Sequence, residues 1–491
     1  MSWKTMERLI ISLKAFVQNS LCFRFSTSWI GYVLLKYLSE DFWMHYIPNT
    51  DEDRAAMLAA IGVKNFEDLL QAIPKTLRLD KSFAFPESKS EWEVRRQMLA
   101  YAQKNQDITG RVSFLGGGIY DHFIPAVVRA MGARSELYTA YTPYQPEVSQ
   151  GTIQIIYEFQ SMICELFGMD AANASIYDGA TALAEAVLLA GSHTRRKKIL
   201  WPETVHPHYR QVTETIGNAV GIQTEIVPSP NGVVAVAELR GSLDDETAAV
   251  VLQYPNFLGI IEEIKLLIEA THEHGAMAIV VADPIAMGVL EPPGAMGADM
   301  VVGEGQALGI DPSYGGPGLG LFAAKSELVR KIPGRIAGVA KDRQGKRGFT
   351  LTLQTREQHI RRDRATSNIC TNQGLCATLA TIYLALVGPE GLREIAQTCM
   401  AKAHYLAEQL SKISGVKLAS DKSFFKEFAV KFSVSPSQVV DHLLSKGIFA
   451  GIPLQHFRMG MDDFLLVAVT EQRTKEEMDT YVAAVKEIVS S

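Results

Sequence analysis

Four short segments of this chain carry residues whose types and order could do chemistry together. Residues Asp178–Thr181 open an expected helix, where a glycine turn, free backbone N–H groups and the positive helix end favour a phosphate. His206 begins a second expected helix, and its ring could stack on a flat ligand. Asp283 follows an apolar strand, where its carboxylate could pair with a protonated ring nitrogen. Each segment alone also fits a structural role, such as a helix cap or a core histidine, so the information lies in their order.

That order is the one that a pyridoxal-phosphate fold requires, and the fourth segment tests it. In such a fold, the lysine that binds the cofactor comes after the strand that follows the aspartate. Here the strand expected at 299–303 is followed by Glu304–Gly309, and the lysine position holds Gln306. An amide nitrogen is not a usable nucleophile and cannot form an imine. Because no lysine lies between Lys265 and Lys325, no near neighbour can take its place.

The elements that must position these residues alternate between strand and helix. The sequence predicts strands at 198–201, 224–227, 248–253, 277–282, 299–303 and 319–323, and helices at 181–192, 207–216 and 260–274. Alternation at this spacing is typical of a largely parallel sheet with helices on both faces. We therefore expect an α/β domain in this region.

Different patterns flank the alternating region. Helices are expected at 53–61, 66–73, 91–104, 146–166, 372–387 and 392–413, and the tail predicts strands at 428–432 and 464–469 with helices at 435–446 and 474–488. A Gly-, Tyr- and Pro-rich stretch at 116–150 is too polar and aromatic for a simple linker. We expect four parts: an extension at 1–42, a helical arm with a glycine- and tyrosine-rich interface segment at 43–150, a large α/β domain at 151–370, and a small C-terminal α+β domain at 371–491.

The composition limits the class of protein. With 47% hydrophobic and 21% charged residues, the 491-residue chain is globular rather than disordered, collagenous or coiled-coil. A net charge of −6 is not that of a chain built for nucleic acid, and no apolar run is long enough for a membrane span. The five cysteines form no C-x-x-C pair, which predicts reduced thiols, no metal site and a cytoplasmic location.

The first 42 residues differ from the rest in pattern. They contain interrupted apolar runs, basic residues and serines with little acid, and a second methionine, Met44, precedes the first coherent segment. Three interpretations remain open: an upstream-start artefact or poorly ordered extension, which we favour, an added helix, or a targeting segment.

A basic stretch at 325–364 stands out in this mildly acidic chain. It carries twelve Lys or Arg residues against four Asp or Glu residues. The stretch is either a solvated face or a surface that captures anionic groups of a substrate, a cofactor or an acidic carrier protein.

Longer motifs then indicate a family. The specific stretches are 45–50, 114–121, 138–150, 315–317, 353–362 and 365–370. From about His45 onward, the chain resembles the N-terminal half, or separate α subunit, of the P-protein of the glycine cleavage system, glycine dehydrogenase (decarboxylating). This resemblance implies the type I fold of pyridoxal-phosphate-dependent transferases, with a mostly parallel seven-stranded sheet. It also implies that pyridoxal phosphate is bound covalently by the partner β subunit and not by this chain, which agrees with Gln306.

The resemblance implies a reaction and its partners. Glycine condenses with pyridoxal phosphate and loses CO2, and its aminomethyl group passes to the lipoyl arm of the H-protein. The β subunit would complete an α2β2 heterotetramer, with no nucleic acid or membrane involved. Two rival hypotheses are a self-sufficient pyridoxal-phosphate enzyme that uses another lysine and a non-catalytic scaffold that kept the fold.

Site candidates follow from these stretches together with the residue chemistry. Around the active site or the subunit interface we expect Tyr120, Tyr138, Tyr141, Tyr144, Gln145, Arg356, His359, Arg361, Arg362, Thr366, Ser367 and Asn368. The tyrosines could line a dry cavity or merely pack between subunits, the basic residues could bind anions, and the short polar residues could reach a ligand across the interface. If the pocket of this chain is empty, the cofactor-type residues are relics: Gly179, Ala180, Thr181, His206 and Asp283.

Overall fold

The computed structural model describes residues 49–79, 84–365 and 367–490, and the chain divides into two compact units, Met1–Lys104 and Asn105–Ser491. In the first unit, the described helices are α3 (Asp51–Ile61), α4 (Phe66–Leu69) and α5 (Glu91–Ala102), close to their predicted positions. Capping boxes at Thr50, Asn65 and Ser90 begin them, and none of their residues is buried. The extension expected at 1–42 lies outside the described residues.

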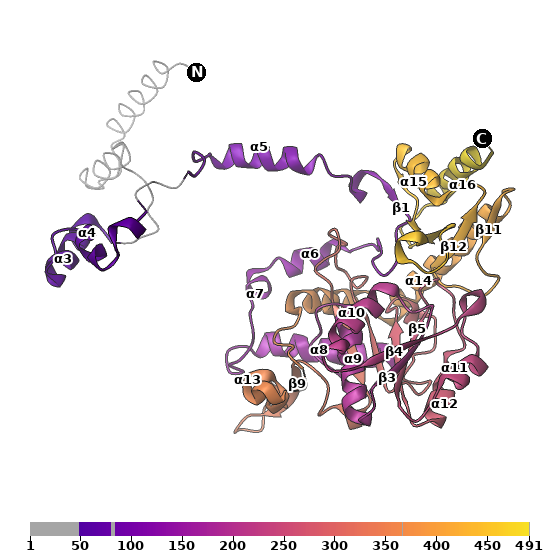
Figure 1. The fold of residues 1–491 in the computed structure, drawn as a ribbon, viewed down its shortest axis with the longest axis horizontal. Coiled ribbons are helices and arrows are strands. Elements are labelled where there is room, and N and C mark those ends of the chain that lie inside the picture. The colour runs from indigo at the N-terminus through magenta and orange to yellow at the C-terminus, as the bar shows by residue number, and fades with distance from the viewer. Residues whose placement is uncertain (1–48, 80–83, 366, 491) are drawn as a thin grey trace, which may run out of the picture. The chain divides into compact units, whose positions relative to one another are not determined.

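A seven-stranded sheet forms the centre of the second unit (Figure 1). The strands are β2 (Ala171–Ala172), β3 (Lys198–Pro202), β4 (Gln223–Val227), β5 (Thr247–Tyr254), β6 (Met277–Ala282), β7 (Met300–Glu304) and β8 (Gly320–Ala324). Their order is β2-β8-β7-β6-β5-β3-β4, and β4, β3, β5, β6 and β7 run parallel. The predicted parallel sheet is confirmed, with β8 antiparallel to both of its neighbours.

Both faces of this sheet are buried. Along β5, Val250 and Leu252 belong to one apolar core, whereas Ala249 and Val251 belong to another on the opposite face. The first core includes residues of α8 (Gln150–Phe167), α12 (Ile264–Glu273) and α14 (Gly374–Ser411), and the second includes those of α9 (Gly179–Thr194). Continuous apolar strands are thus explained by helices on both sides.

Several shorter elements complete the second unit. They are α6 (Ala126–Gly132), α7 (Ser135–Tyr138), α10 (Pro207–Asn218), α11 (Val236–Ser242), α13 (Gln358–Arg361) and an antiparallel hairpin of β9 (Ile336–Lys341) and β10 (Arg347–Thr352). The hairpin lies within the basic stretch, for which the sequence indicated no strand.

Helix α14 joins the large domain to the small one. The two helices expected at 372–387 and 392–413 are one 38-residue element, broken by the non-helical Gly388 with Pro389 after it. Among the described residues, this helix alone is long and apolar enough to cross a membrane by length and composition. Its residues belong to the cores of both the large and the small domain, which accounts for its apolar character.

The small domain is an antiparallel sheet covered by helices, coloured orange to yellow in Figure 1. Its strands β11 (Val416–Leu418), β12 (Glu427–Phe432), β15 (Phe464–Ala468) and β14 (Ile452–Pro453) lie in that order, with α15 (Pro436–Ser445) and α16 (Lys475–Ser490). The short strand β1 (Val112–Ser113) pairs with β13 (Ile448–Phe449), which fixes the start of the Gly-rich segment to this domain.

Candidate functional site

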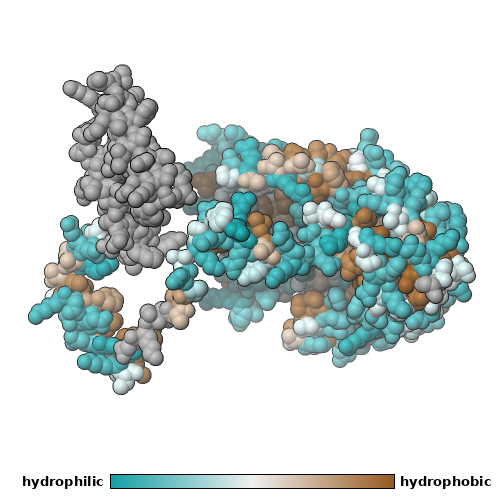
Figure 2. Space-filling model, turned by 90° about the horizontal axis from the view of Figure 1, so that it is seen from above, coloured by the Kyte–Doolittle hydropathy of each residue, from teal (hydrophilic) through white to brown (hydrophobic). Residues whose placement is uncertain are grey.

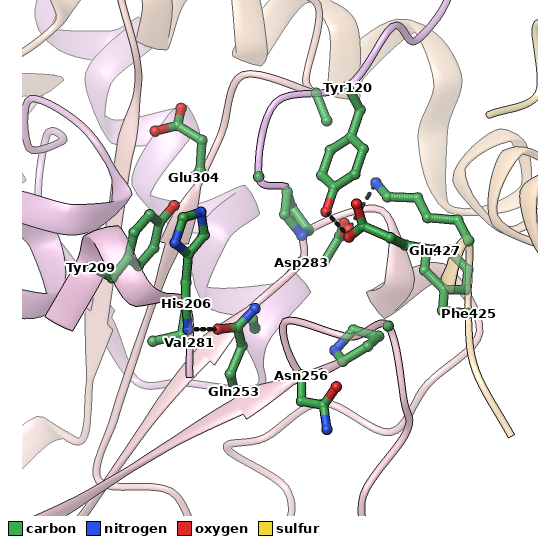
Figure 3. Close-up of a pocket in the computed structure, with 17 residues that line it drawn as sticks. Tyr120, His206, Tyr209, Gln253, Asn256, Val281, Asp283, Glu304, Phe425 and Glu427 are labelled. Atoms are coloured by element: carbon green, nitrogen blue, oxygen red, sulfur yellow. Dashed lines mark hydrogen bonds and ion pairs between the residues drawn. The ribbon is translucent and has the colours of Figure 1, made fainter. Parts of the chain in front are cut away.

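A small cavity lies at the carboxyl ends of the parallel strands, where ligands bind in open α/β sheets. Its volume is about 50 Å³, and its lining includes the predicted His206 and Asp283 together with Tyr120 (Figure 3). Residues of the small domain, Lys426 and Glu427, close it from the other side. The fold has therefore brought the cofactor-type residues of the sequence to one place.

The amino end of helix α9 forms one wall of this site. The helix begins after Asp178 as predicted, and the Asp178 carboxylate caps it by accepting the Thr181 backbone N–H at 2.7 Å. The N–H of Gly179, however, donates to Oε2 of Glu304 at 2.9 Å. Gly179 is required here, since a Cβ atom would lie 2.4 Å from Oη of Tyr209. The position suited to a phosphate thus holds a carboxylate of the protein itself.

His206 is buried beside this helix end, and both of its ring nitrogens are engaged. Its Nε2 donates to the Gly117 carbonyl at 2.8 Å, while its Nδ1 accepts the His208 backbone N–H at 3.2 Å. The ring stacks on Tyr209, with centroids 4.5 Å apart and planes inclined by 12°. Burial lowers the pKa of His206 to about 4, so the ring is neutral at ordinary pH.

Asp283 pairs with a cation from the small domain. The Lys426 Nζ lies 2.7 Å from Oδ2 of Asp283, and the Lys426 side chain is almost fully buried. Burial raises the pKa of Asp283, but the attraction of Lys426 outweighs it and holds that pKa below its usual value. Lys426 also donates to Nε2 of His122 at 3.0 Å and lies 3.7 Å from the centre of the Tyr120 ring.

His122 also belongs to a cluster of potential metal ligands, together with Cys399 and Glu471. Its Nδ1 donates to Oε2 of Glu471 at 2.7 Å, and the Cys399 thiol donates to the same oxygen at 3.4 Å. Although burial opposes it, the contact with His122 lowers the pKa of Glu471 to about 2. Burial raises the pKa of Cys399, which keeps the thiol protonated and makes it a poor ligand. The hydrogen bonds that His122 and Cys399 make to Glu471 are sufficient to explain why these three side chains lie together.

Gln306 is buried and bound to the Gly-rich segment. Its Oε1 accepts the Tyr120 backbone N–H at 2.9 Å, and its Nε2 donates to the Tyr120 carbonyl at 3.1 Å and to the Ile310 carbonyl at 2.7 Å. The Tyr120 hydroxyl donates to Oε2 of Glu427 at 2.9 Å, and the Gly117 N–H donates to the other oxygen at 2.7 Å. Burial raises the pKa of Glu427 to about 7.

These residues do not fit pyridoxal phosphate in the pocket of this chain. A cofactor site usually encloses roughly 300–1,000 Å³, whereas this cavity has about 50 Å³. The helix N–H, the Asp283 carboxylate and the His206 ring are each engaged by a side chain of the protein. No chemical step is therefore assigned to this pocket.

The remaining predicted tyrosines lie away from this cavity. Tyr138 and Tyr141 are 65% and 82% exposed, and Gln145 is exposed beside them in sequence. Tyr144 contacts Arg335, whose Nη2 donates to the tyrosine hydroxyl at 3.2 Å. The His359 ring lies 6.4 Å from the Tyr144 ring, edge to face. Figure 2 shows brown, hydrophobic patches between teal, hydrophilic ones on one face of the molecule.

The predicted arginines differ in their surroundings: one is bound by backbone carbonyls, and two are exposed. Arg356 donates to the carbonyls of Leu353 at 3.0 Å, Gly334 at 2.9 Å and Ile332, so backbone oxygens occupy its guanidinium. Arg361 and Arg362 are exposed.

A second cavity, of about 260 Å³, gathers part of this predicted set. Arg356, Arg361 and Ser367 line it with Arg330, Lys331 and Glu185. Burial raises the pKa of Glu185 to about 7. Asn368 is exposed, and Thr366 lies outside the described residues.

Sequence reasoning did not identify four residues that fill the first cavity: Tyr209, Glu304, Lys426 and Glu427. One signal was available, because Lys426 and Glu427 interrupt the apolar run from Phe424 to Phe432. Adjacent opposite charges inside an apolar strand indicate buried, paired side chains.

Comparison with known proteins places this geometry in a family. The profile of the glycine cleavage system P-protein matches residues 44–485. Glycine dehydrogenase (decarboxylating) subunit 1 of Chloroherpeton thalassium is 51% identical over 91% of this chain and all of its own length. The subunit 1 of Anoxybacillus flavithermus is 47% identical over 89% of this chain and 97% of its own length.

Solved structures agree with this assignment. A glycine decarboxylase (P-protein) of the glycine cleavage system in inhibitor-bound form aligns with a TM-score of 0.83 and 43% identity, covering 91% of this chain and 100% of that chain. A sphingosine-1-phosphate lyase from Burkholderia pseudomallei shares the fold, with a TM-score of 0.61 and 16% identity over 85% of this chain and 94% of its own. The expected type I fold is confirmed, and the chain belongs to the glycine cleavage system P-protein family.

Proposed function

We propose that this chain is the α subunit, subunit 1, of a two-chain glycine dehydrogenase (decarboxylating) of the glycine cleavage system. With its partner, the enzyme decarboxylates glycine and transfers the aminomethyl group to a lipoyl arm. The observation that carries this proposal is the buried Gln306, at the position where the sequence predicts the lysine of a type I fold. Relatives that cover most of the chain are named subunit 1, which supports a shared active site rather than a self-sufficient one.

The partner chain then supplies the lysine that binds pyridoxal phosphate, and this chain completes the site from across the interface. Exposed groups suited to that task are Arg361, Arg362 and Asn368, with Ser367 partly buried among them. A guanidinium binds carboxylate or phosphate through two parallel hydrogen bonds, and a side-chain amide or hydroxyl adds short-range donors. Thr366 belongs to the same set by sequence. We assign these residues to orienting anionic groups of the substrate or cofactor in the partner's pocket.

The assembly proposed is an α2β2 heterotetramer in the cytoplasm, with a lipoylated H-protein as acceptor. The exposed aromatic residues of the Gly- and Tyr-rich segment, Tyr138 and Tyr141 above all, supply apolar area for subunit contact. We also retain the division into parts at 1–42, 43–150, 151–370 and 371–491 as a proposal.

The direct test is reconstitution. The full chain is purified alone, with a candidate subunit 2, and as a complex, and glycine-dependent CO2 exchange is measured with H-protein present. We expect activity only from the complex, and borohydride reduction should attach the cofactor to a lysine of subunit 2. Exchange by this chain alone, with a reduced imine on one of its own lysines, would show that the enzyme is self-sufficient.

Residue-level tests separate catalysis from scaffolding. In the complex, Arg361→Ala and Asn368→Ala should each lower the exchange rate at least tenfold, roughly the effect of one lost charge-assisted contact. Arg343→Ala is the matched control, because Arg343 is exposed near the β9–β10 turn. If all three variants keep the exchange rate of the unmodified complex, these residues do not complete the site and the scaffold hypothesis gains.

A further inference from the structure

We propose that the cofactor pocket of this chain is filled by its own side chains, which reproduce the charge pattern of pyridoxal phosphate. The Glu304 carboxylate takes the place of the phosphate. The Lys426 ammonium takes the place of the pyridinium on Asp283. The Tyr209 ring takes the place of the pyridine ring against His206. The proposal concerns the architecture of this chain and holds whether or not the partner assignment is correct.

At the phosphate end of the pocket, backbone N–H groups bind both oxygens of the Glu304 carboxylate. Oε2 of Glu304 accepts the Gly179 N–H at 2.9 Å at the start of helix α9. Oε1 accepts the N–H groups of Gln306 at 3.0 Å and Leu319 at 2.8 Å. Three backbone donors, one of them at a helix N-terminus, converge on one partly buried carboxylate, an arrangement that otherwise holds a phosphate oxygen.

The opposite end carries the matching positive charge. In cofactor-binding relatives of this fold, an aspartate stabilises a protonated ring nitrogen. Here the 2.7 Å contact between Lys426 and Asp283 supplies that cation within the chain. The Lys426 side chain is only 2% exposed and that of Asp283 15%, so neither charge is left to solvent. Removing one partner would leave the other charge buried and unpaired, which is costly.

The flat part of the pocket is filled by Tyr209. Its ring lies nearly parallel to that of His206, and Figure 3 shows the two side by side below Glu304. His206 also contacts the Phe257 ring, with centroids 4.6 Å apart and planes inclined by 51°. The Tyr209 ring therefore stacks on His206 as a ligand ring would.

These contacts connect parts of the chain that a bound cofactor would otherwise connect. Glu304 joins the end of β7 to the start of α9, and Lys426 joins the small domain to the end of β6. Tyr120 of the Gly-rich segment packs its ring on the Lys426 ammonium. The filled pocket thus holds the two domains and this segment in one closed arrangement without a cofactor.

The cation half of the proposal is tested by chemical rescue in the purified full chain, both alone and assembled with its partner. Lys426→Ala should lower Tm by roughly 5–10 °C. Addition of n-butylammonium should restore at least half of that loss, whereas n-butanol should not. No rescue of a folded Lys426→Ala variant would overturn the surrogate role. Lys431→Ala is the matched control, because its 2.7 Å pair with Asp463 is exposed, and Tm should stay within about 1 °C.

A second variant keeps the test decisive if Lys426→Ala does not fold. Lys426→Met combined with Asp283→Asn removes both charges while keeping the volume. Its Tm should exceed that of either single variant, because no unpaired charge remains. Losses that simply add would show that the two groups do not act as a pair.

The anion half has its own rescue. Glu304→Ala should lower Tm, and inorganic phosphate should raise the Tm of this variant by several degrees more than that of the unmodified protein. Glu291→Ala is the exposed control. Equal phosphate effects on all three proteins would refute the phosphate-surrogate role. Because these readouts are Tm and ion binding, they fail or succeed independently of glycine–CO2 exchange.

Discussion

The backbone of Tyr120 is paired on both sides by the side-chain amide of Gln306. The Tyr120 N–H donates to the amide oxygen at 2.9 Å, and the Tyr120 carbonyl accepts from the amide nitrogen at 3.1 Å. The two residues are 186 positions apart, so this amide fixes the Gly-rich segment to the end of the large sheet. Position 306, where the sequence predicts the cofactor-binding lysine of this fold, is thus a structural clamp in this chain.

Replacing this clamp by a hydrocarbon should destabilise the protein. Gln306→Leu keeps the approximate volume but removes the partners of the Tyr120 N–H and of the buried Ile310 carbonyl, while the Tyr120 carbonyl keeps the His122 N–H at 3.1 Å. We expect a loss of about 2 kcal/mol, the usual cost of unsatisfied buried polar groups. Urea unfolding followed by fluorescence measures it, with the exposed Gln344→Leu as control. A loss below about 0.5 kcal/mol would mean that the clamp is not needed.

Restoring a lysine should not restore a cofactor site. Gln306→Lys provides a nucleophile, but Glu304, Lys426 and Tyr209 leave a cavity of only about 50 Å³, too small for the cofactor. We expect no imine absorbance when pyridoxal phosphate is added, and no reduced adduct on residue 306 by mass spectrometry. An adduct at that residue would show that the pocket opens readily to a ligand.

The sequence predicted the positions of the pocket residues better than it predicted their partners. Asp178 and Asp283 were placed correctly because each follows from a local pattern, a helix start or a strand end. Lys426 and Glu304 were not identified, because their roles depend on contacts with distant segments. The strand β2 was missed because it has only two residues.

In the basic stretch at 325–364 too, the sequence did not predict which groups the side chains contact. Composition indicated either a solvated face or an anion-binding surface, and neither description fits Arg356, whose donors reach three carbonyl oxygens. Nor does composition show that Arg335 is buried, with its Nε 3.8 Å from Oε2 of Glu357. Local charge counts cannot distinguish a guanidinium that binds backbone from one that awaits a ligand.

Arg356 and Arg361 should therefore respond differently to the same conservative change. Arg356→Lys loses donors to buried carbonyls, and we expect about 2 kcal/mol of destabilisation in urea unfolding. Arg361→Lys, at an exposed position, should leave the unfolding free energy within about 0.5 kcal/mol. In the complex it should lower the rate of glycine–CO2 exchange. Equal stability losses for the two variants would contradict this division.

The exposed tyrosines should act on association rather than on folding. Tyr141 is 82% exposed, so Tyr141→Ala removes little packing within this chain. At a subunit interface, the same change should weaken assembly by about 1–2 kcal/mol, roughly a tenfold rise in Kd. Sedimentation of the complex over a dilution series measures this. Ile226→Ala, an exposed apolar residue on strand β4, is the control, and an equal effect there would argue against a specific role.

Glu427 should give the protein a measurable pH dependence. Burial raises its pKa from 4.5 to about 7, so the folded protein holds a proton that the unfolded chain has already released between these values. A raised folded-state pKa stabilises fully below pH 4.5, and that stabilisation is lost as pH rises towards 7. A shift of this size corresponds to about 3 kcal/mol.

Glu427→Gln mimics the protonated form, with its oxygen accepting the Gly117 N–H and its nitrogen donating to the Tyr120 hydroxyl. Other groups, such as Glu185, titrate in the same window, so the test is the difference between the two proteins. The unfolding free energy of Glu427→Gln relative to the unmodified protein should rise by about 3 kcal/mol from pH 4.5 to 7 and stay level above it. A difference independent of pH would mean that Glu427 is ionised throughout, held by Lys426 and its two hydrogen bonds.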